Sequence, residues 1–166
     1  VFAVIAVTAN ARTVYLSPVA LAVDKDGKTL YVAEATASQV AVIDLASGKV
    51  SKNISVSGKP GGITIAPDGS ALYVSIASCE GAVDIVKLPR GKVTASIEVG
   101  HTAVAPVLSP DGKTLYVCNR FNNNVSVDDL ASNKETDRIP VSREPFAMAV
   151  TPDGKFLFAA NLLPAG

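Results

Sequence analysis

Few residues of the types that usually carry chemistry occur in this chain. His101 is the only histidine, and Cys79 and Cys118 are the only cysteines. A single histidine cannot supply a multi-histidine metal site or two axial haem ligands. The patterns C-x-x-C, C-x-x-C-H, G-x-S-x-G and H-E-x-x-H are all missing. The sequence therefore predicts no catalytic residue, no metal site and no cofactor.

Other polar residues are candidates for a binding surface, because they stand in predicted loops near His101. They mix acids, bases and amides, which suits a protein-binding face or an ordinary solvated surface better than a reaction centre. The main candidates are Glu34, His101, Asn119, Arg120, Arg143, Glu144 and Asn161, with Glu80, Asn122 and Asn123 beside them.

A repeat of about 42 residues organises the chain and positions these loops. Four Asp-Gly pairs are separated by 42, 43 and 42 residues and begin at Asp26, Asp68, Asp111 and Asp153. Each pair precedes an apolar run that contains, at one equivalent position, Tyr31, Tyr73, Tyr116 or Phe158. The repeats cover approximately residues 15–56, 57–99, 100–141 and an incomplete 142–166, within a single domain of residues 1–166.

Each repeat has the pattern of four short antiparallel strands. In the second repeat, apolar residues alternate in runs near residues 63–65, 72–76, 83–88 and 93–99, with Gly- and Pro-containing turns between them. Four-stranded units of this length are typical of β-propeller blades, whereas β-solenoid coils, the alternative, usually repeat at shorter periods. We therefore predict an all-β propeller of about four blades' worth. The aligned aromatic rings should pack between neighbouring blades, with Val32, Val74 and Val117 facing the opposite side.

The repeat resembles a known family. Residues 109–119 read Ser-Pro-Asp-Gly-Lys-Thr-Leu-Tyr-Val-Cys-Asn, with variants at residues 25–33, 66–75 and 151–161. This pattern is similar to the propeller repeat named for its Tyr-Val-Thr-Asn motif (YVTN), and the likeness covers residues 14–166. The resemblance implies a periplasmic, secreted or cell-surface protein of bacteria or archaea. It also implies, as further options, a cytochrome-containing partner or a fused cytochrome domain.

Both ends of the chain depart from the repeat. The segment Val1 to Val7 is apolar and precedes Ala9-Asn10-Ala11, so it resembles the remnant of a signal peptide or an outer strand of a preceding blade. The last repeat supplies only two strands. Either the N-terminal residues complete it and close a small ring, or the chain is part of a larger propeller, which we favour.

The two cysteines fall in or near equivalent loops of adjacent repeats. A disulfide needs Cα atoms within about 7 Å of each other. Because Cys79 and Cys118 are offset by four residues in the repeat, free thiols are the default expectation and a disulfide is the alternative.

Charge and hydropathy exclude other classes of partner. The chain has 15 basic and 15 acidic residues and no two adjacent basic residues, so nucleic acid is not an expected partner. No apolar run approaches the roughly 20 residues of a membrane span.

We predict an exported, non-enzymatic binding or scaffold module for a protein partner or for neighbouring propeller blades or a domain. The alternative is a propeller enzyme similar to a lactone hydrolase, or an accessory domain of a quinone or cytochrome oxidoreductase.

Overall fold

The computed structural model describes residues 16–163, which form fourteen β-strands in four sheets. Two complete sheets come first: β1 (Pro18–Val23), β2 (Thr29–Glu34), β3 (Gln39–Asp44) and β4 (Lys49–Ser55), then β5 (Pro60–Ile65), β6 (Ala71–Ile76), β7 (Ala82–Lys87) and β8 (Lys92–Glu98). The third sheet contains β9 (Ala103–Leu108), β10 (Thr114–Asn119), β11 (Asn124–Asp129) and β12 (Lys134–Pro140). The fourth contains β13 (Pro145–Val150) and β14 (Leu157–Asn161). No helix that could cross a membrane occurs in residues 16–163.

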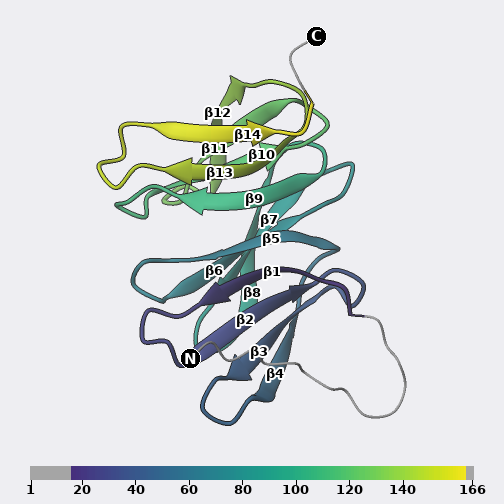
Figure 1. The fold of residues 1–166 in the computed structure, drawn as a ribbon, viewed down its shortest axis with the longest axis vertical. Helices are drawn as coiled ribbons and strands as arrows, with labels where there is room; N and C mark the ends of the chain where they lie inside the picture. Colours follow the sequence, from purple (N-terminus) through teal and green to yellow (C-terminus); the bar gives the residue numbers. More distant parts are fainter. Residues whose placement is uncertain (1–15, 164–166) are drawn as a thin grey trace.

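The sheets are arranged as the blades of a β-propeller. In each blade, consecutive strands pair antiparallel in chain order. The first strands of successive blades, β1, β5, β9 and β13, contact one another, and they follow in that order along the long axis of the molecule (Figure 1). The all-β propeller fold, with about four blades' worth of chain, is therefore confirmed.

The Asp-Gly pairs form the turn between the first two strands of each blade. All four glycines have positive φ values: Gly27 (66°), Gly69 (74°), Gly112 (69°) and Gly154 (71°). A side chain at Gly27 or Gly69 would meet no atom within 4 Å, so backbone conformation and not crowding favours glycine there. The repeated dipeptide thus fixes the return of the chain from the first strand to the second.

The blades are held together by apolar faces that meet between neighbouring sheets. Tyr31 packs in one core cluster with Val74, which lies on the facing side of the second blade. Tyr73 packs in a second cluster with Val117 of the third blade. Val32 belongs to a separate cluster on the other face of the first blade. The predicted division of the Tyr and Val positions between opposite faces is confirmed for these residues.

The prediction is wrong for Phe158, whose side chain is 62% exposed. Tyr116 is only partly buried, compared with exposures of 7% for Tyr31 and 8% for Tyr73. The face that carries Phe158 points away from the third blade, and no further blade covers it within residues 16–163. Burial at this position therefore depends on the neighbouring blade and not on the residue itself.

The predictions for Val1 to Val7 and for ring closure by the N-terminal residues lie outside the described residues. Within residues 16–163, the fourth blade consists of β13 and β14 alone.

We predict a large loss of stability for one truncation at this repeat position and almost none for another. Replacing buried Tyr73 with Ala should lower the free energy of unfolding by about 3 to 5 kcal/mol, because it leaves a cavity between two blades. Phe158→Ala should change it by less than about 0.5 kcal/mol, because that ring is exposed. Chemical denaturation of both variants provides the measurement. Equal losses would contradict the packing described here.

Candidate functional site

We call the binding surface that the sequence predicts in the loops near His101 the rim. Two of its predicted residues, Asn119 and Glu34, make hydrogen bonds within the blades. Asn119 is fully buried at the end of β10, where its Oδ1 accepts the Gly100 N–H at 2.8 Å and its Nδ2 donates to Asn124 Oδ1 at 2.8 Å and to Ser126 Oγ at 2.6 Å. Glu34 is 7% exposed and its Oε2 accepts the Gln39 Nε2–H at 2.6 Å. The carboxamide of Asn119 and the carboxylate of Glu34 are therefore not available on the surface to bind a partner.

Other rim residues converge around the loop between β10 and β11. The guanidinium of Arg120 donates to Glu144 Oε2 from Nη2 at 2.7 Å and from Nε at 3.0 Å. Its Cζ also lies 5.3 Å from the ring centroid of Phe121. The His101 ring meets the same phenyl ring edge-on, with centroids 5.2 Å apart. We call His101, Arg120, Phe121 and Glu144 the rim cluster.

Two asparagines of this loop form hydrogen bonds to the backbone of the connecting segments on either side. Asn122 Oδ1 accepts the His101 N–H at 2.5 Å, and Asn123 Oδ1 accepts the Glu144 N–H at 3.0 Å. His101 and Glu144 stand in the connections that precede β9 and β13. The two hydrogen bonds therefore hold the backbone on either side of the loop and fix the place of the rim cluster.

The remaining predicted rim residues lie outside this cluster, and two of them take part in hydrogen bonds to backbone carbonyls. Arg143 is exposed, and no hydrogen bond of its side chain is found within residues 16–163. Glu80 is exposed, and its backbone carbonyl accepts a hydrogen bond from the Ser78 hydroxyl. Among residues 16–163, the side-chain amide of Asn161 donates only to the Ala159 carbonyl, at 3.3 Å. The structure thus brings together His101, Arg120 and Glu144 but not the whole set.

Phe121 is a surface residue that the sequence analysis missed. Its side chain is 53% exposed although it contacts both Arg120 and His101. The equivalent positions in the first two blades are Thr36 and Ser78, so an aromatic residue in this polar loop was the available signal. Aromatic and arginine side chains placed together are typical of the energetic centres of protein interfaces.

A cleft between the second and third blades reaches this cluster. One part, of about 810 Å³, is lined by residues of both blades: Cys79, Glu80, Gly81, Ala82, Ser96, Glu98, Val99, Gly100, His101, Asn122 and Arg138. A second part, of about 480 Å³, continues between β8 and β12 and shares Ser96, Glu98, Val99 and Arg138 with the first. The cleft therefore extends from the rim to the outer strands.

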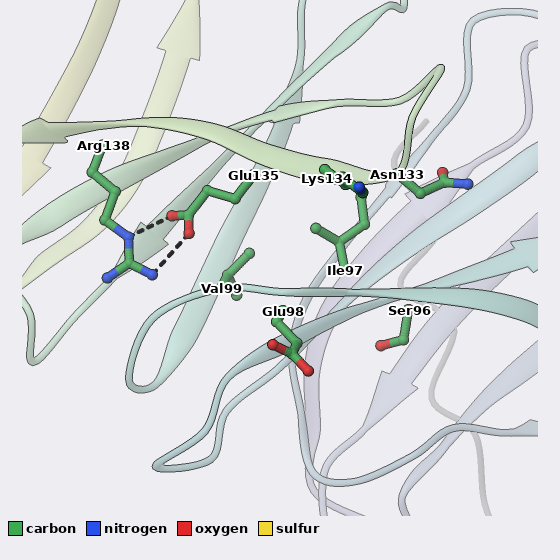
Figure 2. Close-up of a pocket in the computed structure, with 8 residues that line it drawn as sticks. All are labelled: Ser96, Ile97, Glu98, Val99, Asn133, Lys134, Glu135 and Arg138. Atoms are coloured by element: carbon green, nitrogen blue, oxygen red, sulfur yellow. Dashed lines mark hydrogen bonds and ion pairs between the residues drawn. The ribbon is translucent and has the colours of Figure 1, made fainter.

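An ion pair forms the β12 wall of the cleft. Arg138 donates to Glu135 from Nε to Oε1 at 2.6 Å and from Nη2 to Oε2 at 2.8 Å. Figure 2 shows this pair with Val99 and Glu98 of the opposite wall. Two parallel hydrogen bonds hold the guanidinium plane in a defined orientation.

A buried carboxyl group lies beside that ion pair. Asp128 is fully buried, and neither carboxylate oxygen has a hydrogen-bond partner among the described residues. The strand register places it at the position that Ile43 and Val86 occupy in the first two blades. A polar group without a partner at an apolar position destabilises the folded state, so stability does not account for this residue.

Burial is the largest cause of a raised pKa at Asp128, from 3.8 to about 7. The negative charge of Glu135 raises the pKa further, and the positive charge of Arg138 opposes the rise. Turn aspartates behave oppositely: the Ser109 hydroxyl, for example, lowers the pKa of Asp111. Asp128 therefore titrates in a pH range where such turn carboxyls are already ionised.

The raised pKa predicts a loss of stability with rising pH. The folded state holds the Asp128 proton more tightly than the unfolded state, so this contribution is complete below about pH 4 and lost as the pH approaches about 7. The full difference corresponds to about 4 kcal/mol. The melting temperature of the wild type should fall over this range, and that of Asp128→Asn should not. Asp26→Asn, in an exposed turn, is the matched control and should keep the wild-type slope; an unchanged slope in Asp128→Asn would contradict this account.

The two cysteines are free. Cys79 is exposed in the cleft, whereas Cys118 is fully buried and its burial raises the thiol pKa to about 12. No group of three or more His, Cys, Asp or Glu side chains placed to hold a metal ion occurs in the part of the chain that the structure describes. The cleft therefore offers the exposed Cys79 thiol, hydrogen bonds and mixed charges to a ligand.

Comparisons with known proteins agree with the fold. The model of the family described as lactonase, seven-bladed β-propeller, matches residues 92–162. Among solved structures, a chain of hydrazine synthase from Kuenenia stuttgartiensis is similar, with a TM-score of 0.82 and 28% identity over 91% of this chain and 44% of that chain. No curated protein sequence matches. This chain spans less than half the length of the hydrazine synthase chain, and together the two similarities and the sheet arrangement identify it as β-propeller blades.

Proposed function

We propose that this chain is a non-enzymatic binding module that engages a protein partner through the rim cluster and the adjoining cleft. The observation that carries the proposal is the exposed Phe121 ring, flanked by Arg120 and His101. An apolar ring held between polar groups provides buried contact area without a large loss of side-chain freedom. The Arg120–Glu144 bond keeps the guanidinium in place before a partner arrives.

The cleft supplies the polar part of the same surface. Glu98 is exposed on its β8 wall, and Arg138 is 45% exposed on its β12 wall despite its bond to Glu135. Charges of both signs at the edge of an apolar contact favour one orientation of a partner more than they add affinity. A peptide or protein loop of mixed charge fits this surface, with an apolar side chain against Phe121.

Replacement of Phe121 tests the proposal. Phe121→Ala should weaken capture of the partner in a pull-down from native extract without changing the melting temperature, because the ring is largely exposed. Phe156→Ala removes a similarly exposed ring, 61% exposed and outside the rim cluster, and should leave capture intact. A partner captured equally by both variants would place the binding surface elsewhere.

A second set of variants compares how much the two predicted rim arginines, Arg120 and Arg143, contribute to binding. Arg120→Ala removes the bond to Glu144 and the contact with Phe121, so it should weaken capture strongly. Arg143→Ala changes an exposed side chain outside the cluster and should have a smaller effect. Isothermal titration with the identified partner gives both affinities. Equal losses would indicate a diffuse electrostatic contribution rather than the rim cluster.

We further propose that these blades serve within a larger propeller protein, of the YVTN type, in the periplasm or at the cell surface. The similarity to less than half of a hydrazine synthase chain supports the first part, and the repeat at residues 109–119 supports the rest. A cytochrome-containing partner or fused domain follows from the same resemblance. Cell fractionation, followed by an absorption spectrum of the purified complex, tests location and haem content.

Lactone hydrolysis is a second candidate function, supported by the family match to residues 92–162. Its acid–base groups would be His101 and Glu98, which line the cleft. Titration of the acid released from an aldonic acid lactone measures this activity. Hydrolysis that is lost in both His101→Ala and Glu98→Gln would favour the enzyme, whereas rates equal to the uncatalysed reaction would favour the binding module.

A further inference from the structure

A pair of carboxyl side chains in the third blade stands where the first two blades have a pair of apolar side chains. Asp128 of β11 is directly opposite Glu135 of β12 in the strand register. Two carboxylates in this relation repel each other, so the pair requires a proton or a cation to stabilise it. The equivalent cross-strand pairs are Ile43 with Val50 in the first blade and Val86 with Val93 in the second.

The register also brings a guanidinium to the same face of the blade. Arg138 of β12 is opposite Ser126, which lies two residues before Asp128 in β11. Alternate residues of a strand share a face, and cross-strand partners share it too. Asp128, Glu135 and Arg138 therefore lie on one face, and Figure 2 shows the Glu135 and Arg138 side chains directed at each other.

This face is directed at the second blade. Leu115, the cross-strand neighbour of Asp128 on β10, packs in a core cluster with Ile97 of that blade. Ile97 also lines the part of the cleft whose β12 wall contains Glu135 and Arg138. Asp128 is thus enclosed between the two blades, beside the ion pair that forms the cleft wall.

The charges that shift the pKa of Asp128 both come from β12: Glu135 raises it and Arg138 lowers it. On the other side of Asp128, β10 contains no charged residue. Arg138 is therefore the cation available to an ionised Asp128 among residues 16–163. The other charged residues of β7, β8 and β12 are exposed, apart from Asp84, which bonds to Ser57; they are Lys87, Lys92, Glu98, Lys134 and Asp137.

We propose that Asp128, Glu135 and Arg138 form a proton-dependent switch in the wall of the cleft. While Asp128 carries a proton, the guanidinium of Arg138 bonds Glu135 alone, as the structure shows. When Asp128 loses the proton, the guanidinium turns to bridge both carboxylates.

The burial of Asp128 drives this rearrangement. Neither of its carboxylate oxygens has a hydrogen-bond partner among residues 16–163, and a buried carboxylate without a partner strongly destabilises the fold. The Arg138 side chain is 45% exposed, so it is not packed on all sides and can turn. Because burial raises the pKa of Asp128 to about 7, the rearrangement falls near neutral pH.

The two states give the cleft different walls. With Asp128 protonated, Arg138 lies at the cleft surface beside Glu135. With Asp128 ionised, the guanidinium turns inward and the cluster carries one more negative charge, which favours a cationic group of a partner over an anionic one. The effect on a partner rests on the proposed function, whereas the switch itself does not.

Crystal structures of the wild type at about pH 5 and about pH 9 test the switch, because these values lie on either side of the expected transition. Arg138 should bond only Glu135 at the lower pH. At the higher pH, one of its nitrogens should also lie within about 3.2 Å of an Asp128 oxygen. The same arrangement of Arg138 in both structures would overturn the proposal.

Two variants assign the change to Asp128. Asp128→Asn keeps the shape of the side chain without its charge, so it should hold the low-pH arrangement at both pH values. Asp129→Asn is the matched control, because it removes a neighbouring carboxylate that bonds Ser132 instead. This control should change with pH as the wild type does. An Arg138 movement that persists in Asp128→Asn would assign the switch to another group and overturn the proposal.

Carbon-13 NMR of the Asp128 carboxyl gives the midpoint of its titration in solution, with the chain alone. The midpoint should lie near pH 7 in the wild type. It should rise by about one pH unit in Arg138→Gln, which removes the cation, and fall in Glu135→Gln, which removes the competing anion. A wild-type midpoint below about pH 5, or one that neither variant moves, would contradict the switch.

These measurements require no partner. Loss of capture in Phe121→Ala tests the binding module alone, so failure of that proposal is distinguishable from failure of the switch.

Discussion

Burial of one sheet face against the next is the interaction on which this structure depends. A single four-stranded sheet has two faces, and Tyr31 or Tyr73 becomes buried only when the Val74 or Val117 face of the following blade covers it. At about 25 cal/mol per Å² of apolar area, each such contact stabilises the pair of blades and not either blade alone. Phe158 occupies the same position in the fourth blade, where no further blade within residues 16–163 covers it, and its side chain is exposed.

Polar bonds set how one blade connects to the next. Asp84 in β7 accepts the Ser57 N–H at 2.7 Å and the Ser57 hydroxyl at 3.0 Å, and Asn119 in β10 accepts the equivalent Gly100 N–H. Both acceptors are fully buried, and each satisfies the connection that enters from the preceding blade. A side chain of the third strand in one blade and of the second strand in the next thus accepts the equivalent backbone N–H of the connecting segment.

Beside the cleft between the second and third blades, one charged residue replaces an apolar residue of the repeat. An apolar residue at position 128 would repeat the core of the other blades, but Asp128 instead lies beside Glu135 and Arg138. The guanidinium of Arg138 lies at the wall of the cleft that reaches Phe121 through His101, and the buried Asp128 carboxyl, whose pKa is raised, lies beside the Arg138–Glu135 pair. Packing, charge and the proposed binding surface are linked at this single interface.

The sequence alone determined the period, the turns and the faces of the strands, because Asp-Gly turns and alternating apolar residues act within a few residues of themselves. It also predicted a larger set of polar loop residues for one surface, of which the structure brings together His101, Arg120 and Glu144. Tertiary structure decided what local pattern does not encode. It buried Asn119 and Glu34, left Phe121 and Phe158 exposed, and placed Asp128 without a hydrogen-bond partner among residues 16–163, because burial at each position depends on the elements that pack against it.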